Sequence, residues 1–237
     1  MDGKLSPSDA PFPVVATLFG LTFVTGLIDG VSFLGLGHVF TANMTGNVVF
    51  VGFALGGATD VSVLRSLAAL GAFASGGVVG GMVTSRRPRT PARHLLIAMY
   101  AEILLLSVAV TAALVTGNEV TSVSVYLLIV STAVAMGLRN AVVRKLAIPD
   151  LTTTVLTLTV TGLAADSRLA GGAGSRSGRR ILSILAMCGG ALTGAMLLRR
   201  FGISITLIAT TLVVAGLASY LFSSERSKDV RGPESTA

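Results

Sequence analysis

Apolar residues gather in six long runs along the chain, separated by short polar segments. The runs cover residues 14–36, 63–83, 95–115, 120–143, 181–198 and 203–222. A helix needs about 20 apolar residues to cross the hydrocarbon core of a bilayer. The runs are apolar on all sides and longer than the alternating segments of about ten residues that build a membrane β-barrel. The pattern therefore predicts an all-α, polytopic membrane bundle with about six full spans.

Two shorter apolar pieces follow polar breaks in the chain. The first break is GHVFTANMTGN at 37–47, and the second is IPDLTTT at 148–154. The pieces that follow them cover residues 48–55 and 155–165. At 1.5 Å per residue, a helix of about ten residues reaches only about half the hydrocarbon thickness. We expect two short broken or re-entrant helices that dip into the bilayer and return.

The basic residues help to choose the topology. If the short pieces return to the face they left and the N-terminus is cytoplasmic, the basic loops at 86–93 and 168–180 lie inside. The outside then keeps only Arg199 and Arg200, with Arg65 near its edge. Because Lys and Arg are enriched in cytoplasmic loops, the charges favour six spans with both termini cytoplasmic. The alternative is that all eight pieces cross and the N-terminus is outside.

The order of long helix, break, short piece and two long helices occurs twice. A gapless alignment pairs Gly26 with Gly137 and Asp29 with Asn140, and it makes the two breaks coincide. Chance similarity between glycine-rich membrane segments is the alternative. Two halves with three spans each have opposite orientations, as in the inverted repeats of many transporters. We predict one membrane domain, 14–222, built from repeats 14–116 and 120–222. It lies between a cytoplasmic segment, 1–13, and a disordered cytoplasmic tail, 223–237.

Composition agrees with a membrane location and changes how the charge is interpreted. Mean hydropathy is +0.81 and charged residues make up only 12% of the chain, against about 25% in soluble domains. The net charge of +7 would suggest nucleic acid as the partner of a soluble protein. Here the basic residues flank apolar runs, where they set orientation and meet anionic headgroups. We expect the lipid bilayer as partner and no nucleic acid.

Residues suited to metal or covalent chemistry are scarce. The chain has one cysteine, Cys188, and two histidines, His38 and His94, with no Cys/His metal pattern. It has no glycine-rich phosphate loop and no HExxH or serine-hydrolase motif. We therefore expect no metal, no cofactor, no catalytic residue and no enzyme activity.

Ionisable residues inside apolar runs are costly and usually face a partner or water. Asp29 lies near the end of the first run, and Arg139 and Asn140 lie at the matching depth of the fourth. We expect Asp29 and Arg139 to meet near the centre, as a charge pair that lines a substrate or proton path. The alternative is an ion pair that only fixes helix packing. We expect Glu102 to extend to the cytoplasmic interface, with a proton carrier as the alternative.

The polar residues of the breaks complete the predicted site. They are Asn43, Thr45 and Asn47 in the first break, and Asp150, Thr152 and Thr153 in the second. Asn, Thr and Asp are also good helix N-caps, which is the structural alternative. A helix that begins within the bilayer must line a cavity or be buried in protein, and its N-terminus favours anions. We predict that these six residues, with Asp29, Arg139 and Asn140, form a substrate site.

Two stretches resemble a known family. They are GLIDGVSFLGLGHVFTANMTGNVVFVGFAL at 26–55 and MGLRNAVVRKLAIPDLTTTVLTLTVTGLAADS at 136–167. Both are similar to the YoaK family of bacterial membrane proteins, which is defined by a domain of unknown function. The resemblance covers most of the chain and implies a multi-pass protein of the bacterial cytoplasmic membrane. It implies no substrate, cofactor or catalytic residue.

Together these observations favour a small secondary transporter or permease with a central site between two broken helices. Its substrate would be a small molecule or an ion, and its small size suggests a homo-oligomer. The main alternative is a membrane scaffold or accessory subunit without transport activity. An intramembrane enzyme ranks last.

Overall fold

The computed structural model describes residues 11–86, 90–116, 122–148, 156–172 and 177–231. All regular elements within these residues are helical. The α-helices are α1 (Phe12–Gly35), α2 (Met44–Leu55), α3 (Val63–Arg86), α4 (Pro91–Thr116), α5 (Ser122–Leu146), α6 (Leu156–Ala165) and α7 (Ser177–Arg231), with a short 3₁₀ turn at Arg168–Ala170. The predicted all-α membrane bundle is confirmed.

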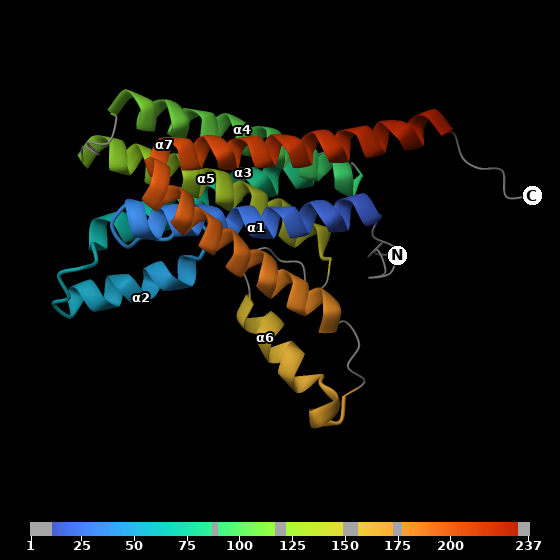
Figure 1. The fold of residues 1–237 in the computed structure, drawn as a ribbon, viewed down its shortest axis with the longest axis horizontal. Helices are drawn as coiled ribbons and strands as arrows, with labels where there is room; N and C mark the ends of the chain where they lie inside the picture. The colour runs from blue at the N-terminus through green and yellow to red at the C-terminus, as the bar shows by residue number, and fades with distance from the viewer. Residues whose placement is uncertain (1–10, 87–89, 117–121, 149–155, 173–176, 232–237) are drawn as a thin grey trace, which may run out of the picture.

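Five of the described helices are long and apolar enough to cross a membrane. The last of them, α7, consists of two arms that meet at Gly202, whose φ of 79° breaks the helix. Only glycine adopts such a backbone conformation without strain. The arms form a sharp V in Figure 1. The sequence separates the runs 181–198 and 203–222 at residues 199–202, and the break falls at the last of these, because the non-helical backbone within α7 is at Gly202.

The predicted disordered tail, 223–237, is wrong over much of its length. Helix α7 continues to Arg231. Residues 223–231 are polar but contain neither glycine nor proline, so nothing in them stops the helix before Gly232 and Pro233.

Helices α1 and α5 form the centre of the bundle. In their most apolar windows 72% of α1 and 67% of α5 is buried, compared with 22% of α3. The long helices run side by side, and α1 begins at the same end of the bundle at which α7 finishes (Figure 1). Because α1 and α5 occupy matching places in the two sequence halves, the centre contains one helix from each half.

Glycines let each central helix contact a helix of the other half closely. A Cβ atom at Gly26 of α1 would collide with the backbone of Met187 in α7. A Cβ atom at Gly137 of α5 would collide with the backbone of Phe73 in α3. The reciprocal contacts are Gly190 of α7 on Phe23 of α1, and Gly76 of α3 on Val134 of α5. Small residues permit this backbone approach in membrane helices.

The two short helices point in opposite directions along the bundle. In Figure 1 α2 runs from the middle toward the left end, and α6 runs from the middle toward the right and away from the bundle. The end of α1 and the approach to α3 lie close together, because His38 Nδ1 is 2.9 Å from the carbonyl oxygen of Asp60. The chain therefore leaves α1 and enters α3 at the same end of the bundle, and the 12 residues of α2 do not run its full length.

Candidate functional site

The first break is bound by Asp29. Its Oδ1 accepts the backbone N–H groups of Thr41 at 3.1 Å and Ala42 at 2.9 Å. Its Oδ2 accepts the side-chain amide of Asn43 at 2.6 Å. Gly35, where α1 ends, lies six residues after Asp29, or about 9 Å at 1.5 Å per residue. The break therefore folds back alongside α1, and α2 begins inside the bundle.

Asn47 holds the chain just before α2. Its side-chain amide accepts the N–H of Phe40 at 2.9 Å and donates to the carbonyl oxygen of Phe40 at 2.6 Å. The residue is fully buried. A buried amide with both ends paired fixes the backbone, because breaking either bond would leave a polar group without a partner.

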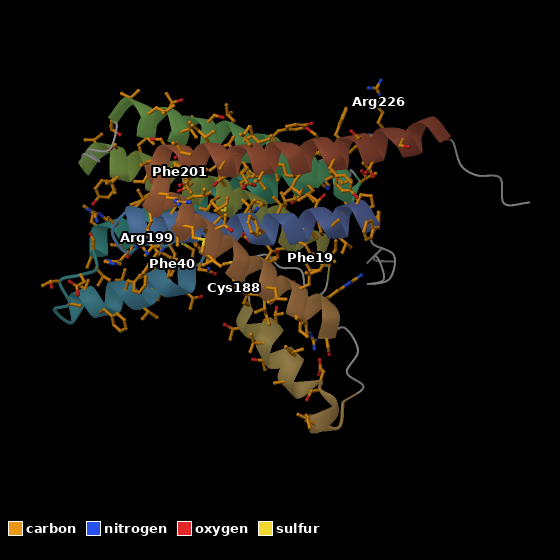
Figure 2. All side chains as sticks on the ribbon, viewed as in Figure 1. Phe19, Phe40, Cys188, Arg199, Phe201 and Arg226 are labelled. Carbon is orange, nitrogen blue, oxygen red and sulfur yellow. The ribbon has the colours of Figure 1, made fainter. Side chains whose placement is uncertain are left out.

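An aromatic cluster attaches α2 to the end of α1. The rings of Phe33 and Phe40 stack at 5.0 Å, and those of Phe40 and Phe50 stack at 5.7 Å. His38 meets the edge of Phe33 at 5.0 Å. Figure 2 shows Phe40 between α1 and α2. The first break is thus held by polar contacts on one side and by aromatic packing on the other.

A second polar group lies deeper, where α1, α4 and α5 meet. Arg139 Nη1 donates to Glu102 Oε1 at 2.7 Å, and both side chains are fully buried. Arg139 Nη2 donates to Thr25 Oγ1 on α1. Within the described part of the chain, Glu102 Oε2 and Arg139 Nε have no hydrogen-bond partner. Such an ion pair is costly to bury, and removing either partner leaves an uncompensated charge.

These contacts correct two predictions from the sequence. The hydrogen bonds and ion pairs of the described residues pair Arg139 with Glu102, whereas Asp29 binds the break. Glu102 does not extend to the interface, because it faces the bundle and finds a cation there. The number of residues between a side chain and the end of its apolar run predicts its depth in the membrane. It does not predict which face of the helix meets a partner.

The two polar groups share one face of α1. Thr25, which contacts Arg139, precedes Asp29 by four residues. Residues four apart on a helix lie one above the other, about one turn apart. A line of buried polar side chains therefore runs from Glu102 through Arg139 and Thr25 to Asp29 and the first break.

The matching position in the second half, Asn140, borders a cavity. The cavity measures about 880 Å³ and lies between α3, α5 and α6. Described residues that line it are Phe73, Ala74, Gly77, Val78, Gly81, Gly137, Asn140, Ala141, Val143, Arg144, Lys145 and Leu158. Asn140 is partly exposed there, and its Nδ2 donates to the carbonyl oxygen of Met136 at 2.9 Å.

The remaining predicted site residues divide into two groups. Thr45 is exposed on the first turn of α2, whereas Asn43 and Asn47 contact the break. Asp150, Thr152 and Thr153 lie outside the described residues. The sequence analysis also missed Thr25, since a hydroxyl in an apolar helix usually bonds to its own backbone. In the described ranges no three His, Cys, Asp or Glu side chains gather as a metal site would require.

Comparison with known proteins now identifies the family. The family described as "Protein of unknown function (DUF1275)" matches residues 17–219. The chain belongs to this family. It is also 34% identical over 154 residues to the UPF0700 transmembrane protein YoaK of Bacillus subtilis (strain 168). That match covers 63% of this chain and 66% of the relative, so it spans slightly less than two thirds of that protein's length.

No solved structure matches the chain. The relative's name describes a transmembrane protein, and the described helices include five of span length. The predicted resemblance to the YoaK family is confirmed, and the protein is a multi-pass membrane protein. Neither the family description nor the relative's name gives a substrate or an activity.

Proposed function

We propose that this protein is a small secondary transporter whose substrate path runs between the two breaks. The observation that carries the proposal is the fully buried Arg139–Glu102 pair, which lies one helical turn from the Asp29 site. Ionisable groups inside membrane bundles are expensive and mark substrate, ion or proton pathways. Here they connect three helices and both sequence halves.

An inverted repeat would give such a transporter its two states. The predicted duplication is supported by the reciprocal contacts of Gly26 on Met187 and Gly137 on Phe73. Gly26 and Gly137 are equivalent in the gapless alignment, and Phe73 and Met187 become equivalent when the following helices are shifted by three residues, so the two contacts occupy matching positions after that shift. Transporters with inverted repeats alternate access by exchanging the conformations of their halves around a central site.

One half is closely packed and the other contains a cavity, as one state of an alternating-access cycle requires. Around the first break the space beside Asp29 is filled by the break itself and by the aromatic cluster. Around the second half the space beside Asn140 is a cavity of about 880 Å³. We propose that this conformation is closed at the end where α1 finishes and open at the end where α5 finishes.

We also propose a membrane location, an orientation and an oligomeric state. The distribution of Lys and Arg supports a bacterial cytoplasmic membrane with both termini inside, so the open end would face the cytoplasm. We propose no enzymatic activity and no nucleic-acid partner. We also propose a homo-oligomer, because many large apolar side chains of α3 and α7 are exposed and either lipid or a second copy would cover them.

A ligand screen followed by uptake measurements tests the proposal. Purified protein is heated with panels of organic acids, amino acids, sugars and inorganic ions, because a ligand that binds the folded state raises the melting temperature. Compounds that stabilise it are then offered, radiolabelled, to proteoliposomes. We expect uptake by the natural sequence and its loss in Glu102→Gln. Absence of uptake for every stabilising compound, or unchanged uptake in the variant, would overturn the proposal.

A scaffold without transport activity remains the second candidate, and one observation favours it. The first break is closed, and Asn47 is fully buried within it with both ends of its amide paired. Crosslinking between cysteines placed at His38 and Asp60, which are in contact in this structure, separates the candidates. A transporter should show crosslinking yields that change when a stabilising compound is added, whereas a scaffold should show constant yields.

A further inference from the structure

The cavity beside Asn140 has an uneven chemical lining. One wall is a strip of α3 that carries small or apolar residues: Phe73, Ala74, Gly77, Val78 and Gly81. The polar lining comes from α5, where Asn140 is followed one turn later by Arg144 and Lys145. Among the described lining residues there is no carboxylate. The cavity therefore offers an apolar surface that ends at two cations and an amide.

We infer that this cavity binds an organic anion that carries an apolar part. The charged group would meet Arg144, Lys145 and the amide of Asn140, and the apolar part would lie along the strip of α3. This inference rests on the proposed function, because it names the class of substrate that enters the open half. At about 880 Å³ the cavity is within the range of small-molecule sites, which are mostly apolar with a few placed polar groups.

The cations are specific to this half of the molecule. Under the alignment that pairs Gly26 with Gly137, the positions equivalent to Arg144 and Lys145 are Phe33 and Leu34. Phe33 stacks on Phe40 and helps to close the first break. The repeat thus does not impose positive charge here, and the two cations, which also suit a cytoplasmic helix end, give this half alone a positively charged cavity wall.

Two kinds of molecule share this chemistry. One is a water-soluble organic anion from the aqueous phase, and the other is an anionic phospholipid from the surrounding leaflet, since basic pockets between membrane helices bind such headgroups. Binding is therefore measured in an uncharged detergent. The soluble probe is octanoate, with octanol as its neutral match, and the lipid probe is phosphatidylglycerol, with phosphatidylcholine of the same acyl chains as its match.

The first pair of variants tests the charge. We expect octanoate to bind at least tenfold more tightly than octanol, and Arg144→Gln with Lys145→Gln to remove that preference. The matched control is Arg199→Gln with Arg200→Gln, because these residues are adjacent exposed arginines and Figure 2 places Arg199 at the left end of the bundle. The control should keep the preference. A preference that is absent, or lost equally in both double variants, would overturn the inference.

The second pair of variants tests the cavity. A Cβ atom at Gly81 has no neighbour within 4 Å, and Gly81 lines the cavity. A side chain can therefore leave the backbone at Gly81 without a clash at Cβ, and Gly81→Leu should occupy part of the cavity and weaken octanoate binding at least tenfold. Gly71→Leu is the control, because Gly71 is equally open on the same helix but is not among the lining residues. Unchanged binding in Gly81→Leu would contradict the inference.

The outcomes separate this inference from the proposed function. Tight, charge-selective binding without uptake into proteoliposomes would contradict the proposed transport and support the anion site. Uptake that is confined to cations or neutral compounds would support the proposed transport and contradict the anion site. Preference for phosphatidylglycerol over phosphatidylcholine, with no octanoate preference, would identify the anion as lipid and remove it as a transported solute.

Discussion

Helix α2 follows the central helix α1, and helix α6 follows the central helix α5, but different contacts hold the two short helices in place. The start of α2 is fixed by three hydrogen bonds to Asp29 and by the stacked rings of Phe33 and Phe40. Helix α6 is joined to α7 by Arg180, which donates to the carbonyl oxygen of Gly162, and its Leu158 is 71% exposed.

The residue at the matched position explains part of this difference. A carboxylate such as Asp29 accepts several hydrogen bonds and contributes charge-assisted strength. Asn140 is uncharged, and its Nδ2 donates one hydrogen bond to the carbonyl oxygen of Met136 on its own helix. The two matched positions thus differ in the charge that each side chain contributes to its hydrogen bonds.

The largest expected effect concerns the ion pair between the halves. Glu102→Gln leaves the Arg139 guanidinium buried without its counter-charge, which should cost about 3–5 kcal/mol of unfolding free energy. Replacing both residues with apolar ones of similar volume, Glu102→Met and Arg139→Met, should recover most of that loss. Unfolding by denaturant in detergent measures both variants. Equal losses in the single and the double variant would mean that the pair has no role in coupling α4 to α5.

A smaller effect should distinguish the two breaks directly. Asp29→Ala removes three hydrogen bonds to a charged group and should cost about 2–4 kcal/mol, since such bonds are worth about 1.5–3 kcal/mol each and part of the loss is recovered by water. Asn140→Ala, at the matched position, removes neutral hydrogen bonds and should cost less, about 0.5–1.5 kcal/mol for each bond. Unfolding in denaturant gives both values. Similar losses would show that the two halves are held alike, against the comparison above.

The sequence predicted the bundle well because the signals that define it are long and one-dimensional. The apolar run at 14–36 became α1, and Gly26 and Gly137, which the alignment pairs, both became helix contacts. The interaction partners of the buried polar residues were harder to predict. Asp29 was expected to pair with Arg139, but a carboxylate near a helix end can also bind the backbone of the segment that folds back. Glu102 was assigned to the cytoplasmic interface because the lipid-facing and buried sides of α4 have similar hydropathy.

Asn47→Ala should have a moderate effect that stays within the first half. The variant leaves the N–H and carbonyl of Phe40 without their partner in a buried place, which should cost about 1–3 kcal/mol. Amide hydrogen exchange checks where the loss falls. We expect faster exchange at the start of α2 and unchanged exchange in α6. Faster exchange in both would indicate that the two short helices open together.

The smallest effect is expected at Thr45, which lies in the same break as Asn43 and Asn47 but is exposed. The Thr45 hydroxyl makes no hydrogen bond to another described residue. Thr45→Ala should therefore change the unfolding free energy by no more than about 0.5 kcal/mol. This makes Thr45 informative for function, because stability and transport can be separated there. If uptake falls strongly in Thr45→Ala while stability is unchanged, the hydroxyl meets the substrate when the first half opens. If neither changes, closure of the first break depends on Asp29, Asn47 and the aromatic cluster, and the polar character of the break alone is not a guide to its site residues.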